Sequence, residues 1–290
     1  MKKIFTLLAT AALLFVSCSN DNTVLEGEAV EVSFRAEIPV TRADAGELTV
    51  NKVVCAVFEK DEEIKKLRKV IDIVDGQDIV FAPKLIKSRT YDIVFWAMKD
   101  DCYNVDDLTK ISRNGNPAIA HNGADYDAFT ASENVNVINS VKQDVILKRP
   151  LAQLNVAISE DDWNTAANTF GMTPTTTEIK VAKKTFCALC GAAEYIGAET
   201  GETEYITYNL TASGEAINVN GTDYKSIASC YIFAEDDEEE YIIDIISVKD
   251  REGNVIHSDV TIPAVTLQNN YKTNIVGSIL TSSISYEISP

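Results

Sequence analysis

Histidine is scarce in this chain, and the motifs that usually carry chemistry are missing with it. The 290 residues include only two histidines, His121 and His257, and neither lies in an HxxxH or HExxH spacing, which argues against a zinc-protease site. The glycines of residues 114–123 lack the strand-to-helix context and the Lys-Ser/Thr pair of a phosphate-binding loop. No Ser/His/Asp arrangement and no strong pair of carboxylates stands out. We therefore expect no enzyme activity, no cofactor and no metal site.

Positive charge is also in short supply. The chain has 26 Lys and Arg against 44 Asp and Glu, for a net charge of −18 and a pI near 4.5. Nucleic acids and anionic membrane surfaces attract basic chains, so this balance argues against non-specific binding to either. We expect no nucleic-acid partner.

The apolar run at the N-terminus is too short to span a bilayer. It covers residues 4–16 and follows Lys2 and Lys3, whereas a spanning helix needs about 20 apolar residues, so the pattern is typical of a signal peptide. Ser17 precedes Cys18, as in a bacterial lipobox, although Phe15 stands where leucine is usual. We predict a signal peptide over 1–17 and lipidation, including palmitate-type acylation, at Cys18. The alternative is an ordinary secretory signal that contains a cysteine.

Cysteine is used too unevenly to suggest a disulfide framework. The cysteines after the lipobox are Cys55, Cys102, Cys187, Cys190 and Cys230. This odd, irregular set fits small buried side chains better than paired thiols. C187-A-L-C190 follows a strand pattern, and residues i and i+3 of an extended strand face opposite sides, so the pair can bridge only across a turn. We expect a structural role for it, with a metal or redox role as the alternative.

Alternating and β-branched segments dominate the rest of the chain, bounded by Gly, Asn, Asp and Pro. The predicted strands are 48–58, 69–74, 77–81, 90–98, 135–138, 144–148, 151–158, 178–186, 204–210, 227–233, 241–248, 255–262, 274–280 and 284–288. Only 161–168 and 106–110 resemble helices, which argues against α/β folds with parallel sheets. The sequence predicts an all-β protein of two antiparallel sandwich domains.

The predicted domain boundary is Pro150. We expect an N-terminal sandwich over 43–149, with its first strand at 29–40, and a C-terminal sandwich over 150–290. The polar stretch 99–134 predicts a large loop near the end of the first domain. Its aromatic residues Tyr103, Tyr126 and Phe129, with Trp163, could form a stacking platform for glycans, although core or loop-anchoring roles are the stronger interpretation. The acidic run 235–240 predicts a solvated loop, with a loose cation site as the alternative.

The first strand has the cleanest alternation in the chain. Apolar residues fall on every even position, which predicts a strand with one buried face. They are Val30, Val32, Phe34, Ala36, Ile38 and Val40. Pro39 has no N–H to donate and therefore favours a strand end or a sheet edge. Arg42 follows in a small, acidic turn and is a candidate for proteolysis.

Three stretches carry a family resemblance. They are the lipobox with the alternating strand and Thr41-Arg42-Ala43, residues 147–156 (LKRPLAQLNV), and residues 267–281 (LQNNYKTNIVGSILT). Together they resemble the fimbrillin-like lipoproteins of Bacteroidetes, the family that includes type V pilus subunits. The resemblance covers essentially the whole chain and implies two Greek-key, transthyretin-like β-sandwich domains.

The resemblance also implies a mechanism. Pilus-forming members are exported as lipoproteins, cut after an arginine behind the first strand, and assembled when a neighbour's strand fills the vacated groove. Mapped onto this chain, the 18–42 segment is a lipid-anchored pro-segment, Arg42 is the cleavage residue, Ala43 is the new N-terminus, and the six apolar residues of the first strand plug the groove. The expected role is a structural or accessory pilus subunit for cell adhesion. The alternative is that Arg42 is never cut.

The expected partners follow from this role. They are other pilus subunits by strand addition, the outer membrane through the lipid anchor before processing, and host or bacterial surface glycans. The expected location is the outer membrane and cell surface, and the fimbrium if the chain is processed. Only nine residues follow Thr281, with Ile284, Tyr286 and Ile288 alternating, which is short for a donor strand. An uncleaved lipoprotein that serves as a pilus anchor or as a glycan- or ligand-binding module is therefore the competing role.

Overall fold

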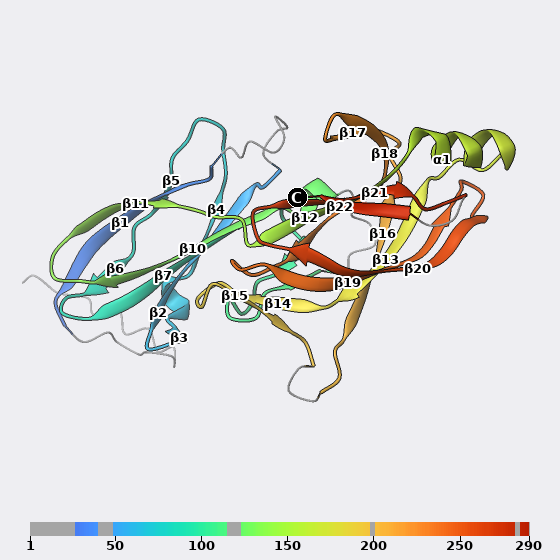
Figure 1. Cartoon of the computed structure of the whole chain (residues 1–290). Coiled ribbons are helices and arrows are strands. Elements are labelled where there is room, and N and C mark those ends of the chain that lie inside the picture. The colour runs from blue at the N-terminus through green and yellow to red at the C-terminus, as the bar shows by residue number, and fades with distance from the viewer. Residues whose placement is uncertain (1–26, 40–48, 115–122, 198–200, 282–284, 290) are drawn as a thin grey trace, which may run out of the picture.

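Strands make up almost all of the regular structure, which confirms the predicted all-β class. The computed structural model describes residues 27–39, 49–114, 123–197, 201–281 and 285–289. In that part of the chain the strands form four large sheets and two small two-stranded sheets (Figure 1). Two large sheets use only strands that end before Arg149, and the other two use only strands that begin after Pro150. These two parts are called the first half and the second half below.

The first half holds two large sheets that face each other. The first sheet contains β11 (Val141–Ile146), β1 (Ala29–Glu37), β5 (Ile79–Phe81) and β6 (Lys84–Ile86). The second contains β10 (Ala128–Asn136), β7 (Thr90–Met98), β2 (Lys52–Glu59), β3 (Glu62–Glu63) and β4 (Lys69–Asp72), with the short 3-10 turn η1 (Lys65–Leu67). The inward-facing side chains of both sheets form one apolar cluster, in which the rings of Phe34 and Phe81 meet Phe95 edge-on.

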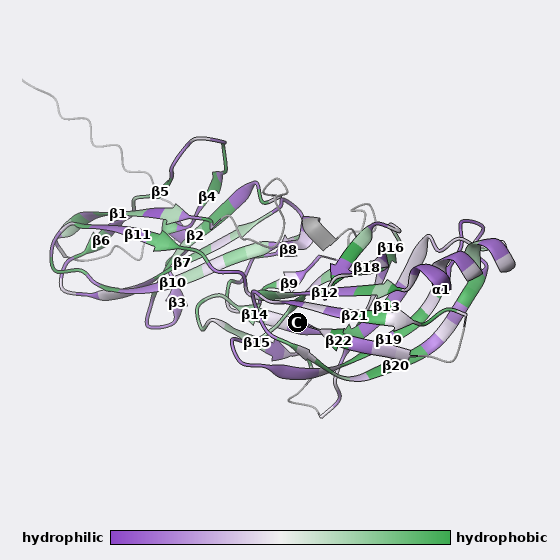
Figure 2. Ribbon diagram, turned by 45° about the horizontal axis from the view of Figure 1, so that its top comes forward, coloured by the Kyte–Doolittle hydropathy of each residue, from purple (hydrophilic) through white to green (hydrophobic). Residues whose placement is uncertain are grey.

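The second half has the same two-sheet plan. One sheet contains β17 (Ala216–Val219), β18 (Thr222–Phe233), β12 (Leu151–Ile158), β21 (Lys272–Ser278) and β22 (Ser285–Ser289). The other contains β16 (Tyr205–Thr211), β13 (Thr176–Ala182), β19 (Glu239–Lys249) and β20 (Val255–Leu267). Apolar and polar residues alternate along these strands, as Figure 2 shows, because one face of each strand lies on the shared core.

Two parallel ladders interrupt an otherwise antiparallel arrangement. β1 pairs in parallel with β11, and β12 pairs in parallel with β21. In each half, the first strand therefore lies beside a strand from near the end of that half. Parallel neighbours cannot be joined by a tight hairpin, and in each half the chain passes through the opposite sheet between the two parallel strands. The Greek-key detail of the predicted topology stays a prediction.

A third apolar cluster joins the two halves. Trp96 of β7 is fully buried in it, and its ring lies 5.7 Å from that of Phe186 and 6.3 Å from that of Phe233. Phe186 belongs to the small sheet of β14 (Lys184–Cys187) and β15 (Ala192–Tyr195), and its backbone pairs with that of Ile111. The other small sheet is formed by β8 (Tyr103–Asn104) and β9 (Ser112–Arg113). Division into domains at Pro150 stays a prediction.

Four local expectations need correction or refinement. The stretch 99–134 is not one large loop, because it contains β8, β9, the 3-10 turn η2 (Gly123–Tyr126) and most of β10. The predicted helix at 161–168 is present as α1 (Glu160–Asn164), capped by the Ser159 side chain, followed by the π-helical turn η3 (Thr165–Thr169). No helix forms at 106–110. The predicted strand 178–186 divides into β13 and β14.

Candidate functional site

The inner face of β1 is buried as its alternation predicts. Val32, Phe34 and Ala36 are 1%, 0% and 4% exposed, while Val30 and Ile38 are half-buried and pack against the same cluster. Fully burying a side chain such as Val or Phe contributes about 1.5–3 kcal/mol. The strand is therefore held mainly by its apolar face.

β1 lies inside its sheet, so of the two positions that Pro39 favoured, a strand end or a sheet edge, only the strand end is observed. Its later residues pair with β11 on one side, from Val32↔Val141 to Glu37↔Ile146, and with β5 on the other. Its first residues pair antiparallel with β6. β1 thus lies inside the sheet, so its removal would open a slot lined by backbone groups on both sides rather than shorten an edge.

The outer face of β1 is charged and open to solvent. Arg35 donates from Nε to Asp144 of β11 at 2.9 Å, contacts Glu37 at 2.9 Å, and lies 3.9 Å from Asp78. The hydrogen bond from Arg35 lowers the pKa of the Asp144 carboxyl. Exposed ion pairs of this kind contribute little to stability. They therefore orient β1 relative to its neighbours more than they hold it in the sheet.

β1 ends at Glu37, three residues earlier than predicted. The carbonyl of Glu37 accepts the last bond, from the N–H of Leu147, and Pro39 then has no N–H to continue the ladder. Four predicted functional residues lie outside the described residues: Cys18, Val40, Arg42 and Ala43. Lipidation and cleavage therefore stay predictions.

The aromatic residues proposed as a glycan platform lie in the core. Tyr103, Tyr126 and Phe129 are 4%, 0% and 1% exposed, and the Tyr103 hydroxyl donates to the carbonyl of Tyr126. Trp163 packs against the second-half core and over Gly214, where an added Cβ would clash with its ring. Tyr103, Tyr126 and Phe129 therefore offer no open face for stacking on a sugar, whereas Trp163 is half-buried. The core role, which the sequence also favoured, is the one observed.

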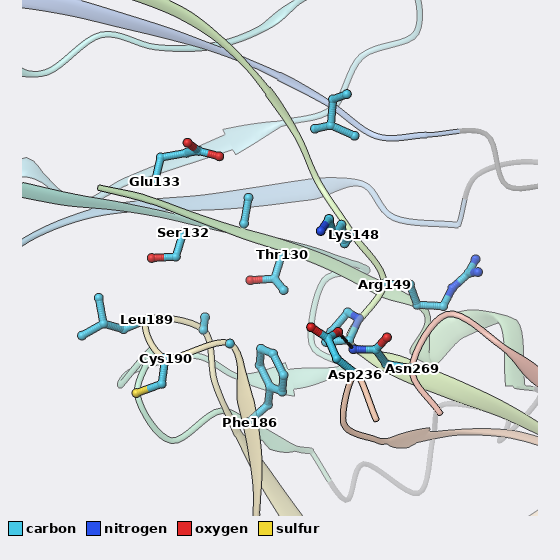
Figure 3. Close-up of a pocket in the computed structure, with 15 residues that line it drawn as sticks. Thr130, Ser132, Glu133, Lys148, Arg149, Phe186, Leu189, Cys190, Asp236 and Asn269 are labelled. Carbon is cyan, nitrogen blue, oxygen red and sulfur yellow. Dashed lines mark hydrogen bonds between the residues drawn. The ribbon is translucent and has the colours of Figure 1, made fainter. Parts of the chain in front are cut away.

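A cavity of about 360 Å³ lies where the two halves meet (Figure 3). One wall is the middle of β10, including Ser132 and Glu133, and another is the turn between β14 and β15 with Leu189 and Cys190. The exposed Lys148 adds an ammonium group. Hydroxyl, carboxylate, ammonium and apolar groups thus surround a space large enough for a small polar ligand.

Arg149, Glu133 and Asp236, which line this cavity, already have side-chain partners. Arg149 donates to both oxygens of Asp127, at 2.6 and 2.7 Å, and Gln143 donates to Glu133 at 2.8 Å. Asn269 donates to Asp236 at 2.5 Å, which fixes the rim from the second half. A ligand would therefore contact polar side chains whose positions are already fixed by these hydrogen bonds.

The Cys187–Cys190 pair forms a disulfide, whose role the sequence left open. β14 ends at Cys187 and β15 begins at Ala192, so the pair spans a hairpin turn in which the Cα atoms approach to 5.3 Å. The sequence pattern indicated that these two cysteines could form a disulfide only across a turn, and this hairpin turn meets that condition. Cys55, Cys102 and Cys230 are free and buried, as small apolar side chains, and burial raises the pKa of Cys55 to about 12.

Other site chemistry is sparse in the described part of the chain. There, no three His, Cys, Asp or Glu side chains come together in a way that could hold a metal ion. Over the same residues, no helix has both the length and the apolar character to cross a membrane. The acidic run 235–240 is partly structural: Glu235 and Glu239 accept hydrogen bonds from Ala193 and Tyr195 of the β14–β15 hairpin.

Solved structures with a similar fold come from Bacteroides and Porphyromonas. A solved structure of a candidate adhesin from Bacteroides thetaiotaomicron is 9% identical, covers 90% of this chain and 97% of its own, and has a TM-score of 0.50. The structure of the tip fimbrial protein Mfa3 from Porphyromonas gingivalis, with a C-terminal truncation, is 15% identical, covers 90% of this chain and 99% of its own, and has a TM-score of 0.47. The structure of the fimbrial anchor protein Mfa2 from the same organism is 11% identical, covers 86% of this chain and 90% of its own, and has a TM-score of 0.42. The predicted fimbrillin-like resemblance agrees with these neighbours.

Sequence comparison gives a family without a function. No curated protein matches the chain. A family model described as a family of unknown function, DUF6562, matches residues 22–290, which is nearly the whole length. The chain belongs to this family.

Proposed function

We propose that this protein is a structural or accessory subunit of a cell-surface pilus, exported as a lipoprotein and assembled by strand exchange after cleavage behind β1. The observation that carries the proposal is the setting of β1. It offers one continuous apolar face to the core and has backbone partners on both sides. A strand from another subunit could take the same slot, with main-chain hydrogen bonds giving affinity and alternate side chains giving register.

The physical balance supports a replaceable strand. The outer face of β1 is polar and mostly exposed, and no strand or helix of the described residues packs on it. The inner face needs apolar side chains at alternate positions, which many strands could supply. Loss of β1 without a replacement would expose the Phe81 and Phe95 side chains that pack around Phe34, which favours rapid refilling of the slot.

The N-terminus of the surface-exposed form tests the proposal. We expect the mature chain in isolated fibres to begin at Ala43, and the Arg42→Ala variant to remain cell-bound and absent from fibres. Arg251→Ala, in an exposed turn of the second half, is the matched control and should be processed normally. Normal fibres from the Arg42→Ala variant would refute the cleavage role.

Strand exchange itself can be tested with a peptide. A chain that begins at Ala43 should bind a synthetic peptide of residues 28–40, because the slot is empty, while the precursor should not. Replacing Phe34 by Asp in the peptide should weaken binding at least about 100-fold, because it buries a carboxylate without a partner. Equal binding of both peptides would exclude a specific slot.

A second candidate role is an anchor or an uncleaved surface module, and it rests on β22. This last strand pairs antiparallel with β21 of its own chain, with Ile288 opposite Ile275. The approach is close at Gly277, where an added Cβ would clash with the Ser285 backbone. A strand seated in its own sheet is not free to enter a neighbour. The anchor role is favoured if the wild-type protein is found at the ends of fibres and never within them, and if the Gly277→Val variant has the same distribution.

A further inference from the structure

The hairpin that carries the Cys187–Cys190 disulfide is held by other bonds as well. β14 and β15 pair along their length, and at the turn the N–H of Gly191 donates to the carbonyl of Cys187 at 2.8 Å. The N–H of Ala188 donates to the carbonyl of Leu108 in the first half, also at 2.8 Å. The disulfide spans only three positions of sequence, and closing so short a loop stabilises a chain least. The hairpin can therefore keep its fold when the disulfide opens.

The two sulfurs of this disulfide differ in access. Cys187 is 5% exposed, whereas Cys190 is an exposed residue at the end of the turn. Thiol–disulfide exchange requires that a thiolate reach one of the two sulfurs. Of this pair, Cys190 is the one that an external thiolate can attack.

A hydrogen bond stabilises charge on the buried sulfur. The N–H of Cys190 donates to Sγ of Cys187 at 3.0 Å. A donor in this position favours the thiolate form of Cys187, and a sulfur that accepts negative charge more easily leaves faster in exchange. Access and leaving ability therefore select the same direction, with attack at Cys190 and departure of Cys187.

The other described cysteines do not compete for the opened pair. Cys55, Cys102 and Cys230 are fully buried, and burial raises their pKa values to about 12, about 11 and about 12, respectively. Buried thiols of this kind are inert in exchange. An opened Cys187–Cys190 pair therefore closes on itself and does not reshuffle with these three.

The cavity at the junction of the two halves gives a small thiol room beside Cys190 (Figure 3). Leu189, Cys190 and Gly191 form part of its wall, and its volume is about 360 Å³. Its described lining includes Cys190 but not Cys187. A group attached to Cys190 thus begins at the cavity wall, where the two halves meet.

We propose that Cys190 is a site of reversible S-thiolation by a low-molecular-weight thiol. The thiol loses its proton to solvent, and the resulting thiolate attacks Sγ of Cys190. A new S–S bond forms, the Cys187–Cys190 bond breaks, and its electron pair leaves with Sγ of Cys187, which takes a proton from solvent. Return attack by Cys187 expels the small thiol and restores the original disulfide. The proposal does not depend on cleavage or on pilus assembly.

Reduced glutathione is a suitable probe for the folded, full-length chain. The exchange products are trapped with iodoacetamide and located by fragment-ion mass spectrometry. We expect glutathione on Cys190 and the alkyl group on Cys187, in at least about tenfold excess over the reverse arrangement. Cys55, Cys102 and Cys230 should stay unmodified, which shows that the chain remained folded. Equal amounts of the two arrangements, or exchange that begins only in urea, overturns the proposal.

Two single variants give an independent readout with glutathione disulfide as the reagent. In Cys187→Ser, the remaining Cys190 thiol should take up one glutathione and release the other. In Cys190→Ser, the buried Cys187 thiol should react at least about tenfold more slowly. Equal rates in the two variants overturn the proposal. If a variant does not fold, as alkylation of its Cys55 would show, the products of the wild-type chain decide alone.

Discussion

β1 and β12 occupy equivalent places in the two halves but are held in opposite ways. Each is the first strand of its half, each has a parallel partner from near the end of that half, and each has an antiparallel partner on the other side. β1 is buried on one face only. β12 is buried on both, with seven of its eight residues buried.

The outer face of β12 explains the difference. Asn155 donates to Asn274 and accepts from Ser229, both at 2.9 Å, in a buried polar network. Ala157 packs with Val219 and Val276 in a separate small cluster, under β17 and β18. On β1 the same face holds Arg35 and its carboxylate partners in solvent. The same place in the topology thus holds a fixed strand in one half and a strand with one free face in the other.

The largest expected effect is on the inner face of β1. Phe34→Ala should lower the free energy of unfolding of the uncleaved chain by about 3–5 kcal/mol, because it removes a fully buried ring and leaves a cavity. Urea unfolding followed by Trp96 fluorescence in a Trp163→Phe background reports on the first half. Val80→Ala, an exposed apolar residue of β5, is the control and should change stability by less than about 0.5 kcal/mol. A loss below 1 kcal/mol would mean that β1 is not held by its apolar face.

The next effect sharpens the contrast from the side of β12. Asn155→Ala should cost about 1–3 kcal/mol, since Asn274 and Ser229 lose their buried partner. Asn134→Ala removes an exposed hydrogen bond to Asp92 in the first half and should cost much less. The free energy of unfolding from urea titrations of both variants checks this order. Equal losses would show that the outer face of β12 is no more fixed than an exposed one.

Acid should weaken the second half through Glu178. Hydrogen bonds from Ser247, first, and from Lys249 lower the pKa of this carboxyl, which joins β13 to β19. Its stabilisation is therefore fully present above the unfolded-state pKa near 4.5 and is lost as the pH falls through the lower, folded value. Glu178→Gln should be less stable at pH 7, by up to about 1 kcal/mol, and should lose less stability between pH 5 and 3 than the wild type. Parallel pH curves for the two proteins would exclude this contribution.

The smallest expected effect concerns the charges on the outer face of β1. Arg35→Gln should shift the unfolding midpoint only slightly, because the ion pairs are exposed. The shift should disappear in 1 M NaCl, where the Debye length falls to about 3 Å. Lys84→Gln, a weak exposed pair with Glu31, is the control. A large, salt-independent loss for Arg35→Gln would mean that the outer face also fixes β1.

Local pattern predicted β1 but not its neighbours. The alternation from Val30 to Ile38 is a property of adjacent residues, so the buried face could be assigned from sequence. The pairing of Val32 with Val141 depends on where distant strands come together, and no periodicity records that. Pro39 favoured a strand end or a sheet edge, and only the strand end is observed, because β1 stops at Glu37 but has partners on both sides.

Polarity misled the sequence interpretation of residues 99–134. Tyr103 and Tyr126 stand among Asp, Asn and Lys and resemble loop aromatics, yet contacts from the second half cover them. The contact of the Arg113 guanidinium with the rings of Tyr126 and Tyr208 had no sequence signal, because a single arginine in a polar segment is ordinary. Only the tertiary structure shows that its guanidinium is enclosed between two tyrosine rings.

The parallel β1–β11 ladder also affects when, during synthesis or export, the first half can finish folding. Arg35 and Asp144, which face each other across it, are 109 residues apart in the chain. On a ribosome or during export, β1 emerges before every other described strand, but its slot is complete only after β11 has followed. Because contacts between residues this far apart in the chain form slowly, the apolar face of β1 remains without its full set of partners until β11 is in place. We expect the nascent protein to depend on a holding chaperone at this stage.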